Sequence, residues 1–187
     1  MYDFRTGDTS KELTLDATRA YIWSRTLRCL RYLCWELSSD AEHDELLQWL
    51  DSLNPDQRLD ALRACLLVFS VSDGRVIPRK FQLSAGLAAY SGKNTIVNAG
   101  TGSGKTLSMV IPLLMDPEAV AIIVSPLKRL QSTQAQEMER FLIKPLVINN
   151  DIELPLTKIQ VFHIEFYTYR LHRGYRYCRC SKKAHIM

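Results

Sequence analysis

Residues 99–106 read Ala99-Gly100-Thr101-Gly102-Ser103-Gly104-Lys105-Thr106. They match the pattern of a P-loop, with alanine at the position where the first glycine of the pattern often stands. Glycines let the backbone curl so that successive N–H groups point at phosphate oxygens, and the following helix adds the positive end of its dipole. In such a loop the lysine reaches the β- and γ-phosphates and the threonine hydroxyl ligates Mg²⁺. The stretch therefore predicts a nucleotide-binding loop.

The alternative is a glycine-rich turn that fits the pattern by chance, which happens in a chain of this length on the order of once in a hundred. The surrounding sequence favours the loop. The apolar run at residues 95–98 predicts a strand before it, and a helix is expected from Lys105 to about Met115. The guanine-reading Asn/Thr-Lys-x-Asp signature of GTPases is absent from the 187 residues.

Strands and helices alternate after the loop. A second apolar strand is expected at residues 120–124, followed by a helix to about Leu142 and a third strand at residues 146–148. Strands that are apolar without alternation are typical of parallel sheets covered by helices on both faces. We therefore predict an α/β fold, in which a helical N-terminal region precedes an incomplete P-loop parallel sheet.

The N-terminal part predicts helices. Residues 1–13 are polar and expected to fray, whereas apolar side chains recur at helical spacing from residue 14 to about 37. A second helix is expected at residues 41–53, and Asn54-Pro55 predicts the capped start of a third, ending near Phe69. A short helix at residues 82–90 then precedes the loop. We place the domain boundaries at 1–74, 75–155 and 156–187.

The composition excludes several classes of protein. Hydrophobic residues make up 47% and charged residues 24%, which is typical of a globular chain rather than a disordered one. No apolar run approaches the ~18 residues of a membrane span. Five cysteines without framework spacing fit a reducing, intracellular compartment. The net charge of +4 resides in residues 166–187, which contain six basic residues and no acidic one.

Residues 76–150 resemble the first RecA-like domain of superfamily 2 helicases, and most closely the RecQ-like DNA helicases. Residues 76–82 (Val-Ile-Pro-Arg-Lys-Phe-Gln) resemble motif 0 and residues 99–106 motif I. Residues 123–127, followed by Leu130 and Gln134, resemble motif Ia. The resemblance implies ATP and Mg²⁺ as ligands, with Gln82 reading the adenine edge. It also implies that Ser125, Pro126 and Leu127 lie along a DNA strand, and that the protein acts in the nucleus. Without the resemblance, Gln82 is an ordinary solvated helix residue and residues 125–127 form a plain turn.

Two parts of the family pattern do not occur in the sequence. The first is motif II, an apolar strand ending in Asp-Glu-x-His or similar; its nearest counterpart is residues 161–165 (Val-Phe-His-Ile-Glu). The second is the other RecA-like domain, which carries the arginine finger. We expect residues 82 and 100–106 to bind ATP without supporting hydrolysis or unwinding, and we assign no catalytic residue. The competing interpretation is a non-enzymatic interaction module with a relic P-loop.

The segment 166–187 interleaves arginines with tyrosines, a pattern that binds nucleic acid through phosphate charge and base stacking. The alternative, which we favour, is a disordered extension without a binding role. Cys178, Cys180, His172 and His185 are four possible metal ligands. Their Cys-x-Cys spacing is shorter than the Cys-x₂₋₄-Cys of structural zinc sites, which disfavours a metal centre.

Overall fold

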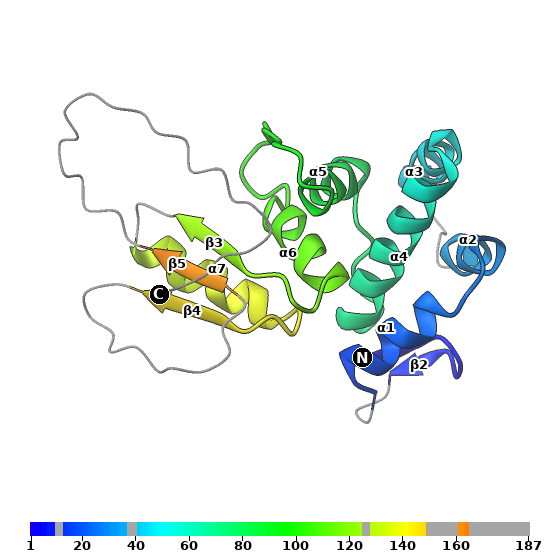
Figure 1. Ribbon diagram of the computed structural model, residues 1–187, viewed down its shortest axis with the longest axis horizontal. Coiled ribbons are helices and arrows are strands. Elements are labelled where there is room, and N and C mark those ends of the chain that lie inside the picture. Colours follow the sequence, from blue (N-terminus) through cyan, green and yellow to red (C-terminus); the bar gives the residue numbers. More distant parts are fainter. Residues whose placement is uncertain (10–12, 37–40, 125–127, 149–160, 165–187) are drawn as a thin grey trace.

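The computed structural model describes residues 1–9, 13–36, 41–124, 128–148 and 161–164. Figure 1 shows two regions: helices α1 to α6 group together, and a small sheet with α7 lies beside them. Within the described ranges the structure has seven helices and only short strands, so helices dominate the fold. None of these helices is long and apolar enough to cross a membrane.

The chain begins with a hairpin. Strands β1 (Tyr2–Asp3) and β2 (Asp8–Thr9) pair antiparallel. The Tyr2 ring lies edge-on to the Phe69 ring at 4.9 Å, and Ser70 Oγ donates a hydrogen bond to the Tyr2 carbonyl at 2.6 Å. The prediction that residues 1–13 fray is therefore wrong for residues 1–9, because aromatic packing anchors them on a later helix.

The helix predicted from residue 14 to 37 is two helices, α1 (Leu15–Trp23) and α2 (Leu27–Glu36). Hydroxyl side chains explain the break. Ser24 Oγ donates to the carbonyl of Tyr21 at 2.7 Å, and Thr26 Oγ1 accepts from the backbone N–H of Cys29 at 3.4 Å. Side chains that bond nearby backbone groups offer the chain an alternative to helix hydrogen bonds. Helical spacing alone did not reveal this.

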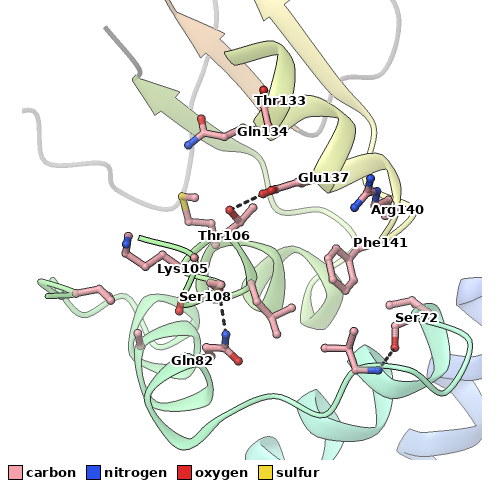
Figure 2. A pocket seen from close by; sticks show the side chains of 18 of the residues that line it. Ser72, Gln82, Lys105, Thr106, Ser108, Thr133, Gln134, Glu137, Arg140 and Phe141 are labelled. Carbon is pink, nitrogen blue, oxygen red and sulfur yellow. Dashed lines mark hydrogen bonds between the residues drawn. The ribbon is translucent and has the colours of Figure 1, made fainter. Parts of the chain in front are cut away.

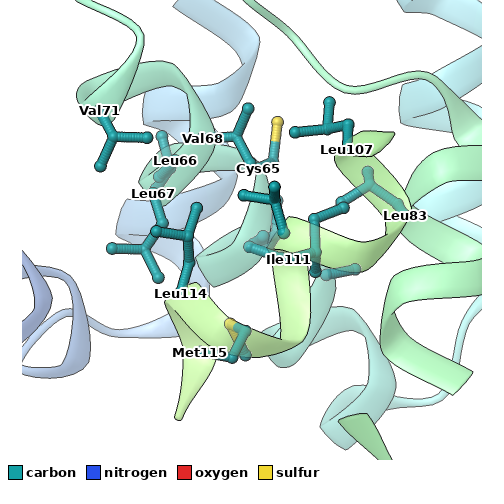
Figure 3. Packing of buried hydrophobic residues seen from close by; sticks show 14 of the residues in the cluster. Cys65, Leu66, Leu67, Val68, Val71, Leu83, Leu107, Ile111, Leu114 and Met115 are labelled. Atoms are coloured by element: carbon teal, nitrogen blue, oxygen red, sulfur yellow. The ribbon is translucent and has the colours of Figure 1, made fainter. Parts of the chain in front are cut away.

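Helix α4 (Pro55–Val71) is the centre of the helical region, and α3 (Ala41–Ser52) precedes it. Asn54 caps α4 by accepting from the backbone N–H of Gln57 at 2.9 Å, with proline at the first helical position, as predicted. Helix α4 contacts α1, α2, α3, α5 and α6. Its second half is buried on all sides and mostly apolar, and Figure 3 shows it packed against side chains of α5 and α6. The labelled members of this core are Cys65, Leu66, Leu67, Val68, Val71, Leu83, Leu107, Ile111, Leu114 and Met115.

Helices α5 (Lys80–Tyr90) and α6 (Thr106–Met115) flank the P-loop, and both were predicted within two residues of their bounds. The two helices pack closely against each other. The reason is Gly86 on α5: a Cβ placed there would lie 2.7 Å from Ile111 Cβ on α6. The missing side chain lets the two helix backbones approach closely.

The sheet contains β3 (Ala121–Val124), β4 (Pro145–Ile148) and β5 (Val161–Ile164), and α7 (Lys128–Glu139) connects β3 to β4. All three strands are parallel in the order β3-β5-β4. The central strand comes from residues 161–164, beyond the boundary predicted at residue 155. The rest of the predicted C-terminal segment, residues 156–160 and 165–187, lies outside the described residues.

The strand predicted at residues 95–98 is not formed. These residues have no regular secondary structure, and the Ile96 side chain is 97% exposed. An extended segment needs a neighbour to satisfy its N–H and C=O groups. Within the described sheet β3 pairs with β5 alone, so residues 95–98 have no strand partner there. The predicted P-loop sheet, in which this strand leads into the loop, is therefore absent from the described residues.

Candidate nucleotide-binding site

A pocket of about 1400 Å³ opens beside the P-loop. Figure 2 shows side chains from the P-loop, α5, α6 and α7 converging on it, with Ser72 on the far side from Thr106. Its wall therefore combines residues that are far apart in the sequence. The residues that line it include Asp73, Gln82, Gly104, Lys105, Thr106, Gln134 and Glu137.

Two glycines shape the loop. Gly102 and Gly104 have φ angles of +81° and +76°, in the left-handed region that residues with a side chain rarely adopt. A Cβ at Gly104 would lie 2.7 Å from Gln82 Nε2, whereas Cβ atoms at Gly100 or Gly102 would meet nothing within 4 Å. The loop is therefore open at Gly100 and Gly102 and is in close contact with Gln82 of α5 at Gly104. This is the form that a backbone cradle for phosphate requires.

Lys105 turns back onto the loop. Its Nζ donates to the carbonyls of Ala99 at 2.8 Å and Gly100 at 2.7 Å. The ammonium is exposed and positioned by its own loop, so a phosphate oxygen can take over one of these contacts without movement of the helix. Thr106 is the first residue of α6, where the positive end of the helix dipole lies.

Gln82 is buried, with 6% of its surface exposed, and its amide is fully engaged. Oε1 accepts from the backbone N–H of Arg79 at 2.8 Å. Nε2 donates to the carbonyls of Ser103 at 3.1 Å and Gly104 at 3.0 Å. Gln82 therefore fastens the start of α5 to the P-loop. The predicted contact with adenine stays a prediction, and it requires the amide to exchange one of these partners.

Sequence reasoning missed one residue of the site. Thr106 Oγ1 donates to Glu137 Oε2 on α7 at 2.8 Å, across 31 positions of the chain (Figure 2). Glu137 stands in a polar helix with several other acidic and amide residues, so no local pattern distinguishes it. Only the packing of α7 against α6 selects it. The hydroxyl predicted to ligate Mg²⁺ is thus joined to a carboxylate.

The predicted DNA-contacting residues and the candidate metal ligands of the C-terminal segment are not placed, whereas Thr101 lines the pocket and Ser103 Oγ donates to the Gly100 carbonyl at 2.8 Å. Ser125, Pro126 and Leu127, predicted to contact DNA, lie outside the described residues between β3 and α7. The candidate metal ligands Cys178, Cys180, His172 and His185 also lie outside them, as does Glu165. Within the described ranges, Cys29, Cys34 and Cys65 form no disulfide, and no three His, Cys, Asp or Glu residues are grouped to hold a metal ion.

The comparisons with known proteins identify the segment that forms most of this pocket. Residues 79–163 match the DEAD/DEAH box helicase family. A DEAD/DEAH box helicase domain therefore lies at residues 79–163, which is less than half of the chain. The match includes Gln82, the P-loop, α7 with Glu137 and most of β5. No curated protein matches the chain.

The helicase domain indicates a nucleotide-binding, helicase-like function with nucleic-acid partners, and this family generally uses ATP with Mg²⁺. It does not favour the alternative of an interaction module with a relic P-loop. The match begins at Arg79, the N-cap of α5, so Gln82 lies close to the start of the matched domain. The match ends at His163, inside the strand that lies at the centre of the sheet.

Proposed function

We propose that residues 79–163 bind Mg²⁺ and ATP in the pocket beside the P-loop, as the nucleotide-binding part of a RecQ-like DNA helicase. The observation that carries the proposal is the position of Lys105 Nζ, 2.7–2.8 Å from two carbonyls of the loop. An ammonium held at the mouth of a glycine-rich loop is placed to receive a phosphate. RecQ-like specificity rests on the resemblance of residues 76–82 and 123–127 to motifs 0 and Ia.

Three features of the chain act together on the triphosphate. The left-handed turns at Gly102 and Gly104 curl the backbone of the loop, as a cradle of N–H groups for phosphate requires. The N-terminus of α6 contributes a partial positive charge, and Lys105 contributes a full one. Thr106 supplies an oxygen ligand of the kind that Mg²⁺ prefers, and the bound ion would neutralise phosphate charge. Gln82 holds the loop in this shape from behind.

The first experiment compares ATP binding by the wild type, Lys105→Ala and Lys93→Ala, using calorimetric titration in Mg²⁺. Lys93 is also exposed and precedes the loop, but it lies outside the pocket. A charge-assisted hydrogen bond contributes about 1.5–3 kcal/mol, so Lys105→Ala should weaken binding roughly 10- to 100-fold. Lys93→Ala should bind like the wild type. Equal titration curves for all three proteins would refute the proposal.

ATP binding at this site does not by itself lead to ATP hydrolysis. Phosphoryl transfer requires acidic and water-orienting groups and an arginine finger in addition to the phosphate cradle. The 187 residues contain no Asp-Glu-x-His stretch. We therefore expect this chain by itself to bind ATP without hydrolysing it at a useful rate and without unwinding duplex DNA. A single-turnover assay with forked DNA tests this, and phosphate release that Lys105→Ala abolishes would contradict it.

The nucleic-acid partner is proposed to be single-stranded DNA, on the resemblance of residues 123–127 to motif Ia. Fluorescence anisotropy with DNA and RNA strands of the same sequence compares the two partners directly. Preference for RNA would contradict the RecQ-like assignment and leave the helicase assignment intact. Deleting residues 166–187 separates the strand contact of motif Ia from any contribution of the basic C-terminal residues.

A further inference from the structure

Glu137 is the acidic side chain at the P-loop end of the pocket. Among the described residues, the pocket is lined by two carboxylates, Asp73 and Glu137. Asp73 is ion-paired with the amino group of Met1 and with Arg75, each at 2.8 Å. Asp73 is the next residue after Ser72 in the chain, and Ser72 lies on the far side of the pocket from Thr106 (Figure 2). Glu137 therefore remains as the described carboxylate next to the phosphate loop.

The hydrogen bond between Thr106 and Glu137 has a fixed direction. A carboxylate only accepts hydrogen bonds, so the single hydroxyl proton of Thr106 points to Glu137. The lone pairs of Thr106 Oγ1 then remain available for a cation. Mg²⁺ is bound in proteins by hydroxyl and carboxylate oxygens, usually one or two carboxylates, together with substrate phosphates and several waters. Thr106 and Glu137 supply this set of donors on one side of the loop.

A further oxygen lies one helical turn before Glu137. Gln134 lines the same pocket, and its Oε1 is buried without a hydrogen-bond partner among the described residues. Residues three positions apart share a helix face, so Gln134 and Glu137 both present polar groups from α7 to the pocket (Figure 2). A hydrated cation satisfies such an oxygen through its water ligands. The residues present therefore fit Mg²⁺.

We propose that Glu137 of α7 supplies the carboxylate that holds the nucleotide's Mg²⁺ together with Thr106. This inference rests on the proposed function and assigns a new residue to the site. Motif II, which carries the acidic residues in the resembling helicases, does not occur in the sequence. Glu137 lies in a different element, the helix that follows β3, and thereby joins the cation site to α7.

The experiment measures ATP affinity by calorimetric titration in Mg²⁺ and in EDTA, for the wild type, Glu137→Gln and Glu139→Gln. Glu139 is an exposed glutamate on the same helix, so its substitution removes the same charge outside the pocket. Removal of a group that supports a metal ligand typically costs about 10- to 100-fold in metal affinity. Glu137→Gln should lose this factor from the Mg²⁺-dependent gain in ATP affinity. In EDTA it should bind ATP equally or more tightly, because a negative charge near the phosphates is gone.

A merely structural link between α6 and α7 gives a different result. Glu137→Gln would then weaken ATP binding by the same factor with and without Mg²⁺, and that outcome would overturn the proposal. An undiminished Mg²⁺ gain would also overturn it. If the wild type and Lys105→Ala bind ATP equally, the proposed function itself fails. If Lys105→Ala weakens ATP binding as expected and Glu137→Gln leaves the Mg²⁺-dependent gain in ATP affinity unchanged, only the role of Glu137 is rejected.

Electron paramagnetic resonance of Mn²⁺ gives a second measurement, which detects the metal ion directly and does not depend on calorimetry. Titrating Mn²⁺ into the protein with ADP should show protein-bound ion for the wild type and Glu139→Gln, and roughly tenfold weaker binding for Glu137→Gln. Should Glu137→Gln fold poorly, Glu137→Asp keeps the carboxylate and should retain part of the Mn²⁺ affinity. A folded Glu137→Asp variant that binds Mn²⁺ tenfold or more weakly than the wild type would overturn the proposal, because the carboxylate would then be present without supporting the ion.

Discussion

Gln82 and Gly104 form one unit: Gln82 Nε2 donates to the Gly104 carbonyl at 3.0 Å, and a Cβ at Gly104 would lie 2.7 Å from the same nitrogen. The glycine thus serves both the left-handed backbone of the P-loop and the close approach of the α5 side chain. The amide in turn holds the loop that the glycine shapes. Substitution at either residue is therefore expected to disturb the other.

Gly104→Ala should weaken ATP binding and lower thermal stability. A non-glycine residue in the left-handed region costs about 1–2 kcal/mol, and the new methyl group displaces the Gln82 amide. Gly102→Ala is the matched control, because Gly102 has the same left-handed φ but a Cβ there meets nothing within 4 Å. Calorimetric titration and thermal unfolding of both variants test the prediction. Equal losses for the two substitutions would show that the contact with Gln82 has no effect.

Gln82→Ala should lower the free energy of unfolding by about 1–3 kcal/mol, because two loop carbonyls and the Arg79 N–H lose their partner. It should also loosen the P-loop and weaken ATP binding. Gln136→Ala, at an exposed position of α7, is the control for the same change of side chain. Urea unfolding measures the stabilities. Comparison of ATP with GTP in the same variants tests the predicted adenine contact separately.

Gly86→Ala should destabilise the fold by about 1–3 kcal/mol through overpacking. The added methyl group would lie 2.7 Å from Ile111 Cβ, so α5 and α6 must separate. Ser84→Ala adds no atoms at an exposed position of the same helix and should be close to neutral. Urea unfolding of the two variants compares them. A neutral Gly86→Ala would mean that the close approach of the two helices is not required.

Asp51→Asn should remove part of the acid sensitivity of folding. Hydrogen bonds from Arg31 at 2.6 and 2.9 Å lower the pKa of the Asp51 carboxyl and tie α2 to α3. A group whose pKa is lowered by folding stabilises the protein at pH values above its unfolded-state pKa of about 3.9. This stabilisation is lost as the pH falls through the folded-state pKa. The pair is exposed, so its contribution is below about 1 kcal/mol.

The measurement is urea unfolding of the wild type and Asp51→Asn at pH 6 and at successively lower pH. The stability difference should be largest at pH 6 and shrink as the pH falls below about 4. Asp44→Asn, an exposed carboxylate on the same helix, is the control. A difference that stays constant over this range would contradict the assignment of the lowered pKa to folding stability.

Local patterns in the sequence predicted what depends on neighbouring residues alone. The cap at Asn54-Pro55 marked the start of α4, and helices were also predicted where α3, α5, α6 and α7 form. The glycines of residues 99–106 predicted a curled backbone, because left-handed φ angles are an intrinsic property of glycine. The resemblance of residues 76–150 to helicases agrees with the family match at residues 79–163.

Tertiary structure decided whatever depends on contacts between distant segments. Residues 95–98 have the composition of a strand but stay without regular structure, because a strand also needs a hydrogen-bonding neighbour and the described sheet offers none there. The hairpin at residues 2–9 exists because Tyr2 packs on Phe69. Glu137 joins the site because α7 packs against α6 and brings its carboxylate to Thr106 across 31 positions, a proximity that no local pattern encodes.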